Sequence, residues 1–450
     1  MLKLMAGAAL IAALTPSMDR YVAEQVDRTG LAGVSVAITK GDEVVHVGGY
    51  GDATAKTPMR VASVTKTFTA FAVMQQVDQG KIDLDAPVST YLPELKIADR
   101  FTARQLLTHT AGLPRAIDTS AIRTSKEFVA ALGSISLGSN GYSNVGFNLL
   151  ARVVEVTSGE PFSAYLKGHV FDPAGMTATV ATVRHDESPA KGHIYVYGNW
   201  VARPEPAAFG LGSGGIVTNA EDMAKWLIIH TNQGRTAEGR QLLSAASVKR
   251  MRTEGFGWSK EGPGEFQHPG NLKTFTAYQH ILPDTGYGIA LLTNTGMTPT
   301  TDDSYGIVRG LVAMARGERA EPVDPVMPVV EWSMVSLTAL ALVLGGLGLR
   351  RSRRWAVRRS GRPAWRKGLP LLRHLIAPAM LLCLPAIAAV LVGQSSVAWS
   401  ELLLVSTSTV VWFAVMAAAS LAVLGAKLLH LARGAEEPAR VRRRRPHAPQ

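Results

Sequence analysis

The sequence predicts an α/β protein: an antiparallel sheet flanked by helices, an inserted mostly α-helical domain, and a C-terminal bundle of three transmembrane helices. Alternating apolar residues near both ends of the region before residue 332 predict hairpins that together form one sheet. Helical periodicity, broken by Pro- and Gly-rich loops, fills the region between them. Three long uncharged apolar runs then close the chain.

Residues 1–17, "MLKLMAGAALIAALTPS", carry one Lys, then an apolar stretch of about ten residues, then small residues. This pattern is typical of a secretory signal peptide, and an uncleaved N-terminal anchor is the alternative. The single cysteine, Cys383, lies in one of the later apolar runs. The sequence therefore excludes a disulfide within the chain and offers no thiol nucleophile before residue 332.

We expect one large domain over residues 18–317. It should begin with an amphipathic helix at 18–29 and a hairpin that turns at 40–42. The region from 83 to about 191 is predicted as helical, and its clearest 3.6-residue period stops at Gly159. The remaining expected elements are a helix capped by Asn219, a second hairpin over 274–294, a helix at 303–316 and a linker at 318–331.

The apolar runs 332–349, 375–400 and 402–426 are each long enough to cross a hydrocarbon core of ~30 Å, which takes about 20 helical residues. A buried core helix is the alternative for any one run. Three runs in succession, with Arg-rich segments after the first and the last, favour three transmembrane helices over 332–426.

The basic character of the chain is local. The formal net charge is +12 over 450 residues, which by itself would suit nucleic-acid binding. Ten Lys or Arg lie within 350–373 and seven within 427–445, so the rest of the chain is slightly acidic. The positive-inside rule places the basic loop 350–373 and the tail 427–450 in the cytoplasm. We therefore expect a multi-pass protein of the bacterial cytoplasmic membrane with an extracytoplasmic large domain and no nucleic-acid partner.

The stretch "MRVASVTKTFTAFAVMQQV" holds the first candidate for chemistry. It predicts a buried amphipathic helix with Ser63 as a good N-cap. Lys66 contradicts a simple cap, because the positive end of the helix dipole disfavours a cation there. Residues three apart share a helix face, so the two side chains can meet. Burial and the dipole would leave Lys66 able to accept a proton from Ser63.

The pattern S-x-x-K alone does not decide the matter, since Ser188–Lys191 also fits it. Two further motifs add context: "YSN" at 142–144 precedes a long helix, and "HPG" at 268–270 precedes the second hairpin. Each has an ordinary alternative, a helix cap with a packed aromatic in the first case and a surface loop in the second.

Together, in this order, the three motifs resemble the serine β-lactamase and penicillin-binding-protein superfamily. The resemblance is to its class C-like branch, which includes D-alanyl carboxypeptidases, D-aminopeptidases and esterases. It runs from about residue 31 to 316 and includes "LLTHTAGLP", "YSNVGFNLLARVVEVTSGEPFSAYL" and "GSGGIVTNAEDMAKWL". It implies a β-lactamase/transpeptidase-like fold.

The resemblance also implies roles for individual residues. Ser63 would be the acylated nucleophile, Lys66 its activating partner and Tyr142 a proton shuttle. Substrate would be bound by Asn144 and by the strand carrying His268 and Gly270. The backbone N–H groups of Ser63 and Asn271 would form the oxyanion hole.

One motif departs from the β-lactamases proper, which carry Lys-Thr-Gly where this chain has His-Pro-Gly. A Lys there supplies a fixed positive charge, whereas His268 is largely neutral at pH 7. We therefore expect a weak preference for substrates that bear a carboxylate, increasing at lower pH as His268 protonates.

These observations predict a membrane-anchored serine hydrolase that acts through an acyl-enzyme on D-amino-acid peptides, β-lactams or small esters. The alternative is a non-catalytic penicillin-binding sensor or cell-wall receptor. No cofactor is predicted, because "GLGSGG" at 210–215 lacks the βαβ unit of a dinucleotide site. No metal is predicted either, because the eleven His show no ligand spacing.

Overall fold

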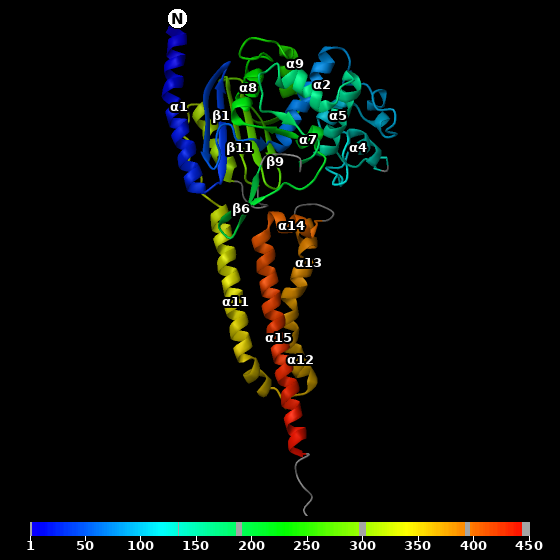
Figure 1. Cartoon of the computed structure of the whole chain (residues 1–450), viewed down its shortest axis with the longest axis vertical. Helices are drawn as coiled ribbons and strands as arrows, with labels where there is room; N and C mark the ends of the chain where they lie inside the picture. The colour runs from blue at the N-terminus through cyan, green and yellow to red at the C-terminus, as the bar shows by residue number, and fades with distance from the viewer. Residues whose placement is uncertain (1, 134, 186–190, 297–302, 392–396, 443–450) are drawn as a thin grey trace, which may run out of the picture. The chain divides into compact units, whose positions relative to one another are not determined.

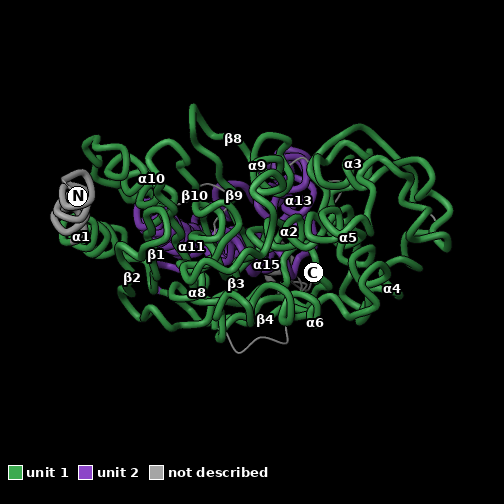
Figure 2. The backbone as a smooth tube through the Cα atoms, turned by 90° about the horizontal axis from the view of Figure 1, so that it is seen from above, with its two compact units in different colours: residues 1–194, 200–327 green, residues 195–199, 328–450 purple. Residues whose placement is uncertain are grey.

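The computed structural model describes residues 2–133, 135–185, 191–296, 303–391 and 397–442. The chain divides into two compact units (Figure 2). The first comprises residues 1–194 and 200–327, and the second comprises residues 195–199 and 328–450. Each unit has its own architecture.

Within the described residues, six strands of the first unit form one antiparallel sheet in the order β2-β1-β11-β10-β9-β8 (Figure 1). N- and C-terminal parts of the unit meet where β1 pairs with β11, with Val34 opposite Thr293. Both predicted hairpins and the sheet that they share are thereby confirmed. The strands are β1 Gly33–Lys40, β2 Glu43–Gly51, β8 Ser259–Gly262, β9 Glu265–Asn271, β10 Thr276–Leu282 and β11 Tyr287–Thr293.

Helices cover both faces of this sheet. On one face, α1 (Leu2–Thr29) and α10 (Asp303–Ala315) pack on the strands and enclose an aliphatic core with Val36, Ile289 and Leu311 at its centre. On the other face, α8 (Ala220–Thr231) packs against β1 and β11. Asn219 caps α8 by accepting the backbone N–H of Asp222, as the sequence predicted.

The helical insertion lies beyond α8 and surrounds α2 (Thr65–Asp78), which is buried on all sides rather than amphipathic. Phe68 stacks on Trp226 with ring centroids 3.8 Å apart, which ties α2 to α8. The other helices of this region are α3 Ala103–Leu107, α4 Ser125–Ala131, α5 Asn144–Ser158, α6 Phe162–Leu166, α7 Leu211–Gly214 and α9 Ala245–Thr253.

Shorter strands complete the first unit. β3 (Met59–Arg60), β7 (Ile216–Thr218) and β4 (Val180–Ala181) make a small antiparallel sheet in the order β3-β7-β4. This sheet holds the chain immediately before Ser63, because the Val61 N–H donates to the carbonyl of Ile216.

The second unit contains three helices that are long and apolar enough to cross a membrane, over 327–357, 364–391 and 407–433 of the described residues. They include α11 Met327–Val357, α12 Ala364–Leu372, α13 Ile376–Leu391 and α15 Thr407–Arg442, and a short α14 (Trp399–Val405) precedes the last. α11 and α15 approach closely at glycines, since a Cβ on Gly345 would lie 2.8 Å from the Cβ of Ala419.

A hairpin tip from the middle of the chain belongs to this second unit. Strands β5 (Gly192–Val196) and β6 (Asn199–Arg203) form the hairpin, and the Tyr197 N–H at its tip donates to Glu331 at 2.7 Å. The same carboxylate accepts the Ser408 hydroxyl. Glu331 on α11 is therefore a buried acid satisfied by neutral donors, a feature that the sequence analysis did not predict.

Candidate active site

Ser63 lies on a single 3₁₀ turn, Ala62–Val64, directly before α2. Ala62 adopts a φ of 49°, a left-handed conformation that a residue with a Cβ rarely takes. The expectation that Ser63 caps the helix is wrong: the N-cap of α2 is Val64, and no side chain caps it. The Ser63 hydroxyl instead lies 3.0 Å from Lys66 Nζ and accepts the Tyr142 hydroxyl at 2.9 Å.

Lys66 is completely buried, and its amine lies among neutral acceptors. Besides Ser63 Oγ, Nζ donates to Asn144 Oδ1 at 2.7 Å and to the Ser213 carbonyl at 2.9 Å. Burial lowers the pKa of the Lys66 amine well below its ordinary value, and the nearby Arg115 guanidinium lowers it further. A neutral amine has two N–H groups, which Asn144 and Ser213 satisfy, so its lone pair is left to face the Ser63 hydroxyl.

Tyr142 and Asn144 reach the site from the N-terminus of α5. Ser143 is the N-cap of that helix and accepts the backbone N–H of Gly146, which fixes the two side chains on either side of it. Burial raises the pKa of Tyr142 to about 12, although the bond to Ser63 and the charge of Arg115 oppose this. Tyr142 is therefore a neutral phenol that donates its proton toward Ser63.

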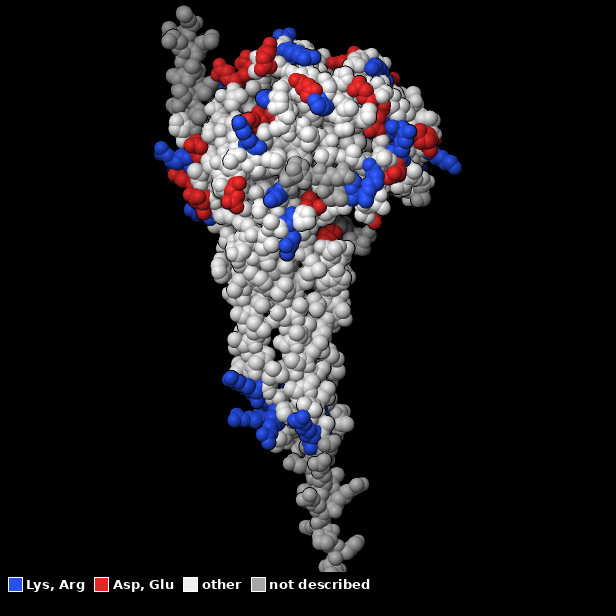
Figure 3. Space-filling view, viewed as in Figure 1, with Lys and Arg blue, Asp and Glu red and all other residues white. Residues whose placement is uncertain are grey.

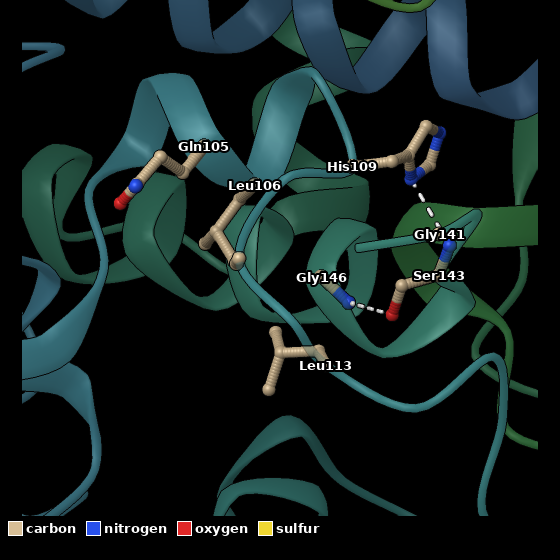
Figure 4. A pocket seen from close by; sticks show the side chains of 8 residues that line it. Gln105, Leu106, His109, Leu113, Gly141, Ser143 and Gly146 are labelled. Atoms are coloured by element: carbon tan, nitrogen blue, oxygen red, sulfur yellow. Dashed lines mark hydrogen bonds between the residues drawn. The ribbon is translucent and has the colours of Figure 1, made fainter. Parts of the chain in front are cut away.

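A small recess is lined by a histidine that the sequence analysis quoted only inside "LLTHTAGLP" (Figure 4). His109 Nδ1 accepts the backbone N–H of Ser143 at 3.0 Å, and its ring lies 4.5 Å from that of Tyr142 between centroids. Burial and the charge of Lys66 lower the pKa of His109 to about 4, so the ring stays neutral and keeps this acceptor. His109 holds the backbone that presents Tyr142.

The glycine-rich stretch 210–215, which lacks the surroundings of a dinucleotide site, provides the Ser213 carbonyl that accepts a hydrogen bond from Lys66. The backbone N–H groups of Gly212 and Ser213 both donate to Asn148 Oδ1 on α5 at 3.1 Å. A Cβ on Gly212 would lie 2.2 Å from the Phe147 carbonyl, so glycine is required for this close approach. The approach brings the Ser213 carbonyl to within reach of Nζ.

Strand β9 passes beside the Ser63 turn. A Cβ on Gly270 would lie 2.1 Å from the Val61 carbonyl oxygen, which explains the glycine of "HPG". Leu272 N–H donates to the Phe275 carbonyl, so these two form a hydrogen-bonded pair, and the neighbouring Asn271–Thr276 pair is of the non-bonded type. The Asn271 N–H therefore points away from β10, as an oxyanion donor on β9 must.

His268 is 4% exposed, and its ring lies 6.4 Å from that of Tyr142 between centroids, so it faces the same cluster. Its Nδ1 donates to the Pro269 carbonyl at 2.7 Å. Burial, with Lys66 next in effect, lowers the pKa of His268 to about 3. The expected protonation of His268 at mildly acid pH is therefore corrected: the ring stays neutral, and its free Nε2 can only accept a hydrogen bond.

The seven predicted site residues thus come from the turn before α2, the first turn of α2 itself, the segment that begins α5, and β9. Ser188, of the second S-x-x-K match, lies outside the described residues. No group of three or more His, Cys, Asp or Glu lies together in the part of the chain that the structure describes. What the cluster offers chemically is a hydroxyl placed between a buried amine of lowered pKa and a neutral phenol.

Known proteins resemble this chain in sequence and in fold. Residues 18–313 match the Beta-lactamase family. The chain belongs to this family. Among curated proteins it is similar to penicillin-binding protein 4 of Amycolatopsis lactamdurans, with 27% identity over 325 residues that cover 63% of this chain and 84% of the relative. The family resemblance predicted from the motifs is confirmed.

Solved structures share the fold of this Beta-lactamase family member. The octameric penicillin-binding protein homologue from Pyrococcus abyssi superposes with a TM-score of 0.57 at 22% identity, covering 68% of this chain and 79% of its own. A D-stereospecific amidohydrolase from Streptomyces sp. superposes with a TM-score of 0.53 at 22% identity, covering 66% and 97%. The predicted β-lactamase/transpeptidase fold, an antiparallel sheet with helices, is confirmed.

Sequence analysis missed three contributors to the site: His109, Ser213 and Arg115. The first two lie inside phrases that carried the family resemblance, "LLTHTAGLP" and "GSGGIVTNAEDMAKWL". Arg115 directly follows the first phrase, in a loop where no pattern was recognised. Their position in or next to a motif was the available signal. A backbone carbonyl that accepts a hydrogen bond, or a contact with a ring, produces no periodic pattern in the sequence.

Proposed function

We propose that this chain is a membrane-anchored serine hydrolase whose first unit works outside the cytoplasm through an acyl-enzyme at Ser63. The observation that carries the proposal is a buried lysine with no carboxylate partner among the described residues, whose amine lies 3.0 Å from a serine hydroxyl. A buried amine whose neighbours are all neutral favours its uncharged form, and an uncharged amine is a base.

In the acylation step, the Ser63 proton passes to the lone pair of Lys66 while Oγ bonds to the substrate carbonyl carbon. The backbone N–H groups of Ser63 and Asn271 stabilise the oxyanion that results. Collapse of this intermediate expels an amine or alcohol, which takes its proton from Lys66, directly or through the Tyr142 hydroxyl. Water then hydrolyses the ester with the same groups as base.

Asn144 retains a donor for the substrate. Its Oδ1 is occupied by Lys66, while its Nδ2 has no acceptor among the described residues. We assign this N–H₂ group to a carbonyl of the acyl side chain. The proposed substrates are D-amino-acid peptides, β-lactams or small esters, and the penicillin-binding name of a relative supports the first two.

The decisive experiment uses the full chain in detergent with a fluorophosphonate and a fluorescent penicillin. We expect covalent labelling by at least one probe, with the adduct on Ser63 by peptide mass spectrometry. Ser63→Ala should abolish the labelling, and Ser188→Ala, at the second S-x-x-K match, should retain it. No labelling by either probe would overturn the mechanism. Labelling without turnover of p-nitrophenyl acetate or nitrocefin would instead favour a sensor.

Membrane anchoring is the second part of the proposal. The three apolar helices carry Lys and Arg gathered at one end of the second unit, and on the face that Figure 3 shows, the sides of these helices are free of charge. The positive-inside rule assigns that end to the cytoplasm. Reporter fusions at Ser360 and after Gln450 should be active only as cytoplasmic reporters. Alkaline phosphatase activity from either fusion would reverse this topology.

A further inference from the structure

Arg115 lies beside the candidate nucleophile without a role in the proposed acylation. Its side chain is exposed, and its guanidinium carbon lies 5.5 Å from the centre of the Tyr142 ring. Its carbonyl accepts the backbone N–H of Asn144 at 2.8 Å. Both ends of the residue thus contact the "YSN" segment, and one aromatic ring, that of Tyr142, separates Arg115 from Ser63.

The Arg115 guanidinium has no counter-charge in the part of the chain that the structure describes. Among the described residues, no carboxylate lies within ion-pair distance of Arg115, and no hydrogen bond leaves its guanidinium. Two other arginines are already occupied: Arg184 donates to the carbonyls of Ser120 and Ile122, and Arg60, on β3, donates to the carbonyl of Arg184. An arginine that is exposed on one side and stacked on an aromatic ring on the other keeps its planar fork available for an anion.

The remaining basic groups of the cluster do not supply a permanent cation. Lys66 is buried among neutral acceptors and serves as the proposed base. His268 uses its one N–H for the Pro269 carbonyl, so it has no donor left for a carboxylate. His109 uses Nδ1 to accept the Ser143 N–H. Among the groups of this cluster that the structure describes, Arg115 is therefore the one fixed positive charge that a substrate anion meets.

We infer that Arg115 binds a carboxylate of the substrate and sets a preference for carboxylate-bearing acyl donors. This inference rests on the proposed function and refines its substrate class. The cation comes from the loop that precedes Tyr142 rather than from β9, where the sequence departs from Lys-Thr-Gly. A planar guanidinium can bind a carboxylate through two parallel charge-assisted hydrogen bonds.

The test compares two substrates that differ only in a carboxylate and its methyl ester, with the full chain in detergent. The measured quantity is the ratio of their kcat/KM values, because any effect of Arg115 on Lys66 cancels in a ratio. We expect Arg115→Met to lower this ratio by about 10- to 100-fold, the range for a charge-assisted pair. Arg115→Lys should keep part of the preference, since it retains the charge but loses the fork.

The matched control is Arg123→Met, which removes the same charge from the same exposed loop at a site that has no contact with Tyr142. Its ratio should equal that of the wild type. An unchanged ratio in Arg115→Met, with Ser63 still labelled by a neutral fluorophosphonate, would overturn the inference and leave the proposed function standing. Absence of Ser63 labelling in the wild type would overturn both the inference and the proposed function. An equal fall in Arg123→Met would show a general surface-charge effect and also contradict the inference.

Discussion

Strand β9 begins at an ionic cluster around the buried Glu265 and ends beside the cluster around Lys66, whose acceptors are neutral. At its start, Glu265 is 1% exposed and meets His280, Arg309 and Arg316. Beside its end, Lys66 is fully buried, but every acceptor around it is neutral. The same strand thus borders a buried acid with two arginine partners and a buried base whose hydrogen-bond partners in the described part of the chain include no acid.

The two arrangements have opposite effects on proton affinity. Burial raises the pKa of Glu265, but His280, Arg309 and Arg316 outweigh it and hold the net value below its ordinary range. Burial lowers the pKa of Lys66, and the only nearby charge that contributes, Arg115, acts in the same direction. A compensated charge fixes structure, whereas an uncompensated one is available for proton transfer. Within one sheet, the charged groups around Glu265 therefore stabilise the fold, whereas the neutral surroundings of Lys66 suit proton transfer.

The largest effect is expected at the uncompensated end. Lys66→Met removes the proposed base and should slow acylation of Ser63 by about 10²- to 10⁴-fold. Because the amine has no buried counter-ion to leave behind, the free energy of unfolding should change by less than about 2 kcal/mol. Acylation rates and thermal denaturation check this, with Lys260→Met on exposed β8 as the control. Wild-type acylation in Lys66→Met would remove Lys66 from the mechanism.

At the compensated end the effects should be reversed. Glu265→Gln removes a buried carboxylate from the His280 ring and from two partly exposed arginines, Arg309 and Arg316, and should lower the free energy of unfolding by about 1–3 kcal/mol. Acylation by the fraction that remains folded should stay close to wild type, because Glu265 touches none of the proposed catalytic groups. Glu261→Gln, exposed in the same hairpin, serves as the control. If Glu265→Gln left the free energy of unfolding unchanged but strongly slowed acylation, Glu265 would have a catalytic role rather than a structural one.

A smaller effect is expected at His109, which positions Tyr142 by accepting the backbone N–H of the adjacent Ser143. His109→Phe keeps the ring beside Tyr142 but removes the acceptor for the Ser143 N–H, so acylation should fall about tenfold. His109→Asn should recover most of the rate, since Asn tolerates a positive φ, here 59°, and its Oδ1 can replace Nδ1. Equal rates in the two variants would show that this hydrogen bond does not position Tyr142.

The sequence was sufficient for the sheet, the hairpins and the three apolar helices, because alternation, turn residues and run length are local signals. It also identified Ser63, Lys66 and Tyr142 as a cluster through three motifs. The expectation that Ser63 caps the helix was wrong. A serine before a helix is usually its N-cap, but here the Ser63 hydroxyl interacts with Lys66 and Tyr142 instead. The roles of Ser213 and Arg115 depend on a backbone carbonyl and a ring contact, which only the assembled fold brings together.

The smallest expected effect concerns the pH dependence of acylation. If neutral Lys66 is the base, the rate should rise with pH through the lowered pKa of Lys66 as one ascending limb. His268 has a pKa of about 3 and His109 of about 4, so neither adds a limb at mildly acid or neutral pH.

His268→Gln tests this point directly, because it removes an imidazole from the cluster without adding charge. The overall rate can change, but the midpoint of the ascending limb should move by less than about half a pH unit, since a neutral ring has little electrostatic effect on the protonation of Lys66. Pre-steady-state acylation by a neutral ester from about pH 5 to pH 9 measures this midpoint across the ordinary His range. A limb that disappears in His268→Gln would make His268 the titrating base and would reverse the assignment of Lys66.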